Sequence, residues 1–83
     1  MPEEEIGKVA DYFAKIEVAA IDLTGTLAVG DTIRIKGYTT DFTQLVESIQ
    51  IEHQNVQKAG PGDSIGIKVK DRVRDHDAVY KVT

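Results

Sequence analysis

The sequence lacks cysteine, and this absence excludes both a disulfide framework and thiolate ligation of zinc. It also lacks any uninterrupted apolar run that approaches about 20 residues, the length that a membrane-spanning helix needs. The start of the chain, from Met1 to Glu5, is acidic where a secretory signal peptide would be basic. We therefore expect a cytoplasmic protein that makes no contact with a membrane.

Basic residues are outnumbered by acidic ones, 10 against 14. The formal net charge of −4 argues against indiscriminate binding to nucleic acid, but it is unevenly distributed, because residues 1–31 carry −5 and residues 32–83 carry +1. With 41% apolar residues the chain is not of a disordered composition, and 83 residues are enough for one domain only. We expect a single domain over residues 1–83, with a flexible acidic N-terminus over residues 1–5.

What the chain does contain is a series of short segments rich in valine, isoleucine and threonine, separated by glycine, aspartate and proline. None of them sustains the 3.6-residue period of a helix, although a helix over residues 9–20 is the competing interpretation. In residues 32–36, Ile33 and Ile35 face one side while Arg34 and Lys36 face the other. The pattern predicts an all-β domain of six to seven strands, which include residues 7–13, 18–23, 32–36, 42–53, 64–70 and 78–82.

The longest predicted strand, residues 42–53, changes its apolar phase along its length. Its apolar side chains stand at even positions in Phe42 and Val46 and at odd positions in Ile49 and Ile51. A β-bulge near residues 47–48 would explain the shift, and a bulge bends a strand so that its sheet can curl. We therefore predict a small, closed or nearly closed, antiparallel β-barrel.

Three motifs occur in a familiar order, namely LAVGDTIRI at residues 27–35, FTQLVESI at 42–49 and AGPGDSIGI at 59–67. In the third, Pro61 and Gly62 suit the second and third positions of a type II turn. Over residues 6–82 the arrangement resembles domain II of elongation factor Tu and related translation GTPases. Stand-alone translation elongation factor-like proteins, and the C-terminal barrels of collagenase-like peptidases that act on tRNA, are similar too, and the motifs do not separate these possibilities.

The resemblance implies a class of partner, which is tRNA, ribosomal RNA or a translation-associated protein. It implies no GTP chemistry, because the phosphate-binding loop of the GTPases is missing, and so we expect no bound nucleotide. The first hypothesis is a non-enzymatic binding module. The second is a protein-interaction or oligomerisation barrel that acts as a detached domain of a larger factor, including a tRNA-modification-linked peptidase-like protein.

Basic side chains on the outward faces of two predicted strands form the candidate binding site, because lysine and arginine can contact phosphates. Tyr38 joins them as a ring that could stack on a base, the alternative being a ring packed over the end of the barrel. An ordinary solvated surface is the competing interpretation, since Asp71, Asp75 and Asp77 dilute the positive charge. The candidate residues are Arg34, Lys36, Tyr38, Lys68, Lys70, Arg72 and Arg74.

Two further patterns predict no chemistry. Residues 62–66 match the Gly-x-Ser-x-Gly motif of serine hydrolases, but Ser64 precedes a strand where that motif needs a helix. Asp75, His76 and Asp77 include metal-ligand types, yet neighbours on an extended segment point in alternating directions. His53 stands apart at the polar end of a strand. We predict no catalytic residue, no metal site and no cofactor.

Overall fold

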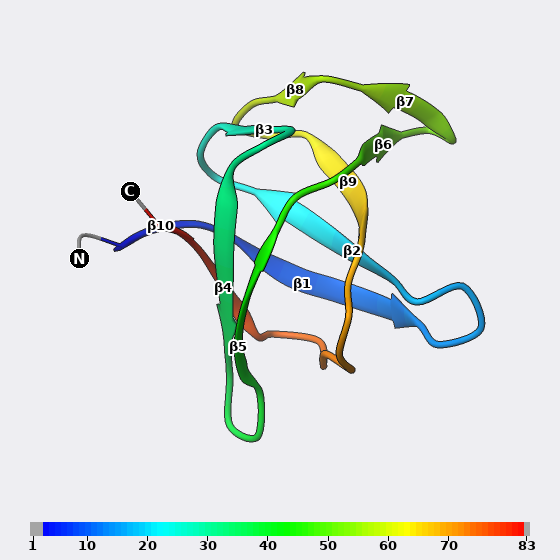
Figure 1. Cartoon of the computed structure of the whole chain (residues 1–83). Coiled ribbons are helices and arrows are strands. Elements are labelled where there is room, and N and C mark those ends of the chain that lie inside the picture. Colours follow the sequence, from blue (N-terminus) through cyan, green and yellow to red (C-terminus); the bar gives the residue numbers. More distant parts are fainter. Residues whose placement is uncertain (1–2, 83) are drawn as a thin grey trace.

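The computed structural model describes residues 3–82, and within that range it consists of ten β-strands and no helix. Accordingly, residues 3–82 include no helix of the length and apolar character needed to cross a membrane. All strand pairs are antiparallel, so the prediction of an all-β domain is confirmed. The strands in Figure 1 are β1 (Glu3–Phe13), β2 (Val18–Leu23), β3 (Leu27–Ala28), β4 (Thr32–Lys36), β5 (Asp41–Leu45), β6 (Ile49–Ile51), β7 (Gln54–Val56), β8 (Lys58–Ala59), β9 (Ser64–Lys68) and β10 (Ala78–Val82).

Eight of these strands form one sheet in the order β5-β4-β10-β1-β2-β9-β6-β7, and β3 pairs with β8 separately. The competing helix over residues 9–20 is wrong, because this segment is the β1–β2 hairpin (Figure 1). Buried and exposed residues alternate here with the two-residue period of a strand. Val9 is buried between exposed neighbours, and Ala19 and Ile21 are buried two positions apart on β2.

The predicted flexible terminus, residues 1–5, overlaps in sequence with the start of β1. Glu3 pairs with Val82, and Glu5 pairs with Tyr80, so residues 3–5 are strand residues at the edge of the β1–β10 ladder. Residues 1 and 2 lie outside the described range. Farther along β1, a Cβ on Gly7 would come within 2.6 Å of the Asp22 carbonyl oxygen, so only glycine fits this close approach of β1 and β2.

The predicted strand over residues 42–53 is broken into two. β5 ends at Leu45 and β6 starts at Ile49, while Val46 turns inward, is buried, and donates its N–H to the Asp31 carbonyl at 2.8 Å. The phase shift marked this break and not the predicted bulge, which is therefore wrong. Register irregularities occur instead in β1, between Glu5 and Gly7 and between Val9 and Asp11.

Sixteen buried aliphatic side chains form one core enclosed by the curled sheet. The described backbone pairs leave β5 and β7 at the two edges of the sheet, so these pairs do not close a barrel. Past the end of β5, Val46 keeps its backbone hydrogen bonds on the β4 side, since it donates to the Asp31 carbonyl at 2.8 Å and accepts from the Gly30 N–H at 2.9 Å. The core comprises Ile6, Val9, Ala19, Ile21, Leu23, Leu27, Ile33, Ile35, Val46, Ile49, Ala59, Ile65, Ile67, Val69, Val73 and Val79.

Candidate functional site

The six basic side chains predicted on one face lie on separate parts of the fold. Arg34 and Lys36 belong to β4, which is flanked by β5 and β10, whereas Lys68 ends β9, which is flanked by β2 and β6. The adjacency of β4 and β9 that a joint basic face would use is thus not found among the paired strands of residues 3–82. The loop after β9 carries the other three, which are Lys70, Arg72 and Arg74.

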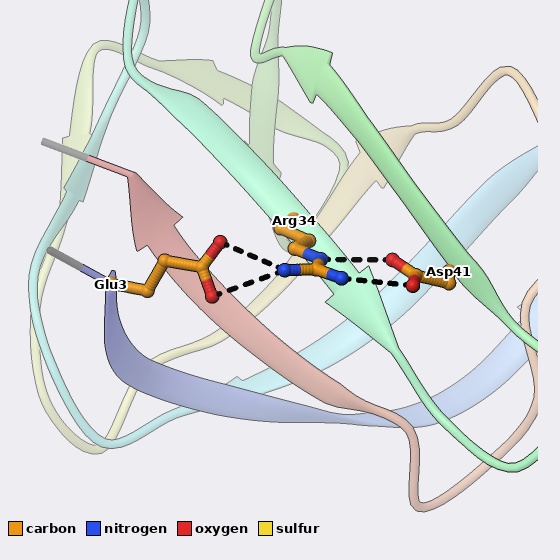
Figure 2. Close-up of polar contacts among 3 residues, drawn as sticks. All are labelled: Glu3, Arg34 and Asp41. Atoms are coloured by element: carbon orange, nitrogen blue, oxygen red, sulfur yellow. Dashed lines mark hydrogen bonds and ion pairs between the residues drawn. The ribbon is translucent and has the colours of Figure 1, made fainter. Parts of the chain in front are cut away.

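Arg34 is held by two carboxylates, as Figure 2 shows. Its Nε and Nη2 donate to the two carboxylate oxygens of Asp41, each at 2.8 Å, and its Nη1 donates to Glu3 Oε2 at 3.2 Å. The Asp41 and Glu3 carboxylates raise the pKa of Arg34, and the hydrogen bonds from Arg34 lower the pKa of Asp41. The guanidinium is therefore occupied by partners from β1 and β5, which leaves little of it for a phosphate.

Tyr38 stands in the tight turn between β4 and β5, and its side chain is fully exposed. The alternative of a ring packed over the end of a barrel is therefore wrong. Lys36, at the end of β4, is exposed as well. These two side chains are accessible at one hairpin tip, apart from the lysines that follow β9.

Lys68 and Lys70 line a groove of about 520 Å³ that lies between the end of β5 and the end of β9. On the β5 side, Leu45 leaves 53% of its surface exposed and adds an apolar side chain to the lining. Two acidic side chains, Glu17 and Glu47, balance the two lysines. The full lining is Glu17, Gln44, Leu45, Glu47, Ser48, Lys68, Val69 and Lys70.

The side-chain amide of Gln44 crosses this groove. Its Nε2 donates to the Lys68 carbonyl at 2.8 Å, and its Oε1 accepts the Lys70 N–H at 2.9 Å. On the opposite side of the same segment, Val69 donates its N–H to the Glu17 carbonyl at 2.9 Å. Residues 68–70 are thus an extended segment with one side on the β1–β2 turn and the other on Gln44. The sequence prediction missed Gln44 and Leu45, because neither their residue types nor their spacing indicates that they meet residues 68–70.

The serine and histidine patterns give no assembled site. Ser64 begins β9 and its Oγ donates to Asp22 Oδ1 at 2.9 Å, as expected for register partners on β2 and β9. His76 is exposed in a turn, with its Nε2 3.6 Å from Asp75 Oδ2. His53, predicted at a strand end, lies in the turn between β6 and β7 with a φ of 66°. In the part of the chain that the structure describes, no three histidine, aspartate or glutamate side chains are grouped to hold a metal ion.

No protein-family model matches the chain. Among curated proteins, it is similar to a protein of Methanocaldococcus jannaschii named as a protease, with 43% identity over 77 residues, 92% of this chain and 19% of that protein. It is also similar to a collagenase of Porphyromonas gingivalis, with 42% identity over 78 residues, 92% of this chain and 22% of that protein. The chain thus spans about a fifth of the length of these relatives.

Among solved structures, the chain is similar to the C-terminal domain of a U32 peptidase from Geobacillus thermoleovorans. The TM-score is 0.90 at 24% sequence identity, covering 96% of this chain and 93% of that domain. A selenomethionine variant of the same domain gives a TM-score of 0.87. The fold is therefore that of a U32 peptidase C-terminal domain. The proteins that match in sequence are thus named as a protease and a collagenase, and the structures that match in fold are of a U32 peptidase C-terminal domain.

The prediction that the chain is a translation GTPase domain II-like protein is therefore wrong. Elongation factor 1-alpha of Methanopyrus kandleri does match at 42% identity, but over only 52 residues, 57% of this chain. The motifs misled because they describe turns: Asp31 Oδ2 accepts the Ala28 N–H and Asp63 Oδ2 accepts the Gly60 N–H, both at 2.9 Å. Any sheet that needs such turns uses these residues. A function in translation or at the ribosome is overturned with the resemblance.

The prediction that the protein is not an enzyme is also wrong as stated. The relatives that match nearly the whole chain are named as a protease and a collagenase, and the matching fold is that of the C-terminal domain of a U32 peptidase. These findings favour the second hypothesis, a domain of a peptidase-like protein. Binding of tRNA or ribosomal RNA stays a prediction.

Proposed function

We propose that this chain serves peptide-bond hydrolysis as a U32 peptidase-type C-terminal domain, acting together with a peptidase portion like the remainder of its relatives. The observation that carries the proposal is the 43% identity to a protease over 92% of the chain. In this role the domain holds the polypeptide substrate for cleavage. An extended surface groove beside an open strand edge suits such a task, because peptide chains commonly bind by strand addition.

We further propose that the sheet approaches a barrel whose gap lies between β5 and residues 68–70. The support is the Gln44 amide, which joins the two sides of the gap through hydrogen bonds of 2.8 and 2.9 Å. Here a side chain makes the hydrogen bonds between the two segments that backbone groups make elsewhere in the sheet. The gap therefore coincides with the groove.

The function is tested by domain exchange in the Porphyromonas gingivalis collagenase. One variant lacks the segment that matches this chain, and a second variant carries this chain in its place. Cleavage of fluorescein-labelled gelatin is measured for both, with circular dichroism as the check on folding. We expect the deletion to lower kcat/KM and the exchange to restore it. A folded exchange variant that cleaves no faster than the deletion variant would refute the proposal.

A further inference from the structure

We propose that the groove between β5 and residues 68–70 is a docking site for an extended polypeptide segment, which binds through its main chain by pairing with these two strand edges. The inference rests on the proposed function and names the form in which a substrate is held. It follows from three features of the groove: two open strand edges, an amide that occupies the gap, and balanced charge.

The first feature is the pair of open edges. Within residues 3–82, β5 pairs only with β4, so its second edge has no strand partner. β9 pairs with β2 along its length but with β6 only at Gly66, which faces Gln50. Beyond Gly66, this side of β9 opens into the groove. Unpaired N–H and C=O groups on a strand edge are a template for a further strand.

The second feature is what fills the gap. The Gln44 amide donates to the Lys68 carbonyl and accepts the Lys70 N–H, the two groups that flank Val69. In a parallel ladder, one residue of the neighbouring strand makes the same two bonds to the groups that flank its partner. A side-chain amide thus stands where the peptide groups of a docked strand would stand.

Exchange of Gln44 for a docked segment costs little. Gln44 is anchored on β5 by a flexible stem, and its side chain is only half-buried. A hydrogen bond near solvent makes a small net contribution when an equivalent partner replaces it. An incoming main chain offers the same donor and acceptor, so no group on residues 68–70 is left unpaired. Gln44 therefore acts as a displaceable competitor.

The third feature is charge, and it favours a polypeptide over a nucleic acid. The groove carries Lys68 and Lys70 on one wall and also Glu17 and Glu47, so its net formal charge is zero. A phosphate backbone would meet the two carboxylates as well as the two lysines, so the groove offers it no net electrostatic attraction. The exposed Leu45 offers an apolar contact to one side chain of the segment. Recognition then depends on main-chain groups, which all sequences share.

The test uses the intact chain and a fluorescein-labelled synthetic peptide of alternating serine and leucine. A matched peptide is N-methylated at alternate residues, which removes main-chain donors and keeps the side chains. Fluorescence anisotropy should show saturable binding of the first peptide, with affinity lowered by about tenfold or more for the N-methylated one. Equal binding of both peptides, or no binding of either, overturns the proposal.

Variants of the protein locate the binding. Gln44→Ala should strengthen binding by about threefold or more, because it removes the competitor. Lys58→Ala, an exposed change on β8 outside the groove, is the control and should leave affinity unchanged. Since Gln44→Ala could disturb folding, the amide resonance of Lys70 in the unaltered protein is followed by NMR as well. A Gln44→Ala protein that binds no more tightly, together with a Lys70 amide that does not shift, overturns the proposal.

Three other outcomes are told apart by these experiments. If light scattering finds a dimer that Leu45→Glu dissociates, the groove is occupied by a second copy of the chain and the proposal is overturned in favour of self-association. If the domain exchange restores gelatin cleavage while the peptide does not bind, only the groove assignment fails. If the peptide binds but the exchange fails, the groove stands and the peptidase role does not.

Discussion

Two regions on the surface of the same sheet contrast in how their polar groups are satisfied. Around Arg34, charged side chains from β1, β4 and β5 neutralise one another across neighbouring strands. Around Gln44, a neutral amide spans two strand edges that have no backbone ladder between them. The sequence marks both regions by charge, through Arg34 in the first and through Lys68 and Lys70 beside the second, yet the first is self-contained and the second is open. Charge alone is therefore a poor guide to where a surface can accept a partner.

The largest effect should come from removing the buried support of the Arg34 region. Ile33 lies on β4 next to Arg34 and has no exposed surface, so Ile33→Ala should lower the free energy of unfolding by about 2–5 kcal/mol. Leu45→Ala, at the groove, is the matched control and should cost less than about 1 kcal/mol because its side chain is half-exposed. Urea denaturation measures both. Equal losses of unfolding free energy in Ile33→Ala and Leu45→Ala would contradict the contrast between a self-contained and an open region.

A smaller effect separates the two regions by their salt dependence. Arg34→Ala removes both ion pairs and should lower Tm at low salt by less than Ile33→Ala does. The loss should shrink in high salt, because salt screens exposed charges. Gln44→Ala removes neutral hydrogen bonds, so its loss should be nearly independent of salt. The measurement is thermal denaturation of the unaltered protein, Arg34→Ala and Gln44→Ala at low and high salt. The contrast fails if the two variants respond alike.

The smallest effect concerns pH and the Asp41 carboxylate. Its pKa is lowered in the folded protein by hydrogen bonds from Arg34, so folding favours the charged form. The resulting stability is present above the unfolded pKa of about 3.9 and is lost as the pH falls through the lower folded pKa. Tm measured through this acidic range should therefore fall more for the unaltered protein than for Asp41→Asn. Parallel curves would show that Asp41 carries none of this dependence.

The fold was largely predictable because local alternation reports burial. Ile33 and Ile35 predicted β4 with its boundaries, and the phase shift after Val46 correctly marked an irregularity. Whether that irregularity is a bulge or a break depends on the hydrogen bond from Val46 to Asp31, a contact across 15 positions that no local pattern encodes. His53 was placed at the end of a strand, whereas it lies with Glu52 in the turn between β6 and β7, where both residues have a positive φ.

The site was less predictable. Arg34 was selected for its charge, but the sequence does not reveal that Glu3, 31 positions away, would share its guanidinium. Gln44 escaped notice because its partners lie 24 and 26 positions downstream, and they meet it only once the sheet has curled. The type of residue gives no hint of such a role, since glutamine on a strand is ordinarily a solvated side chain.

The pairing of the first and last strands also has a mechanical consequence. Because β1 and β10 are antiparallel and Glu3 lies opposite Val82, the two ends of the described chain leave the sheet side by side (Figure 1). A force that pulls these ends apart would peel the ladder open one rung at a time and would not shear all rungs at once. The Arg34–Glu3 ion pair, which reaches across β10, would be among the first links to carry that load. Tension at its ends would thus unzip this domain from the β1–β10 seam.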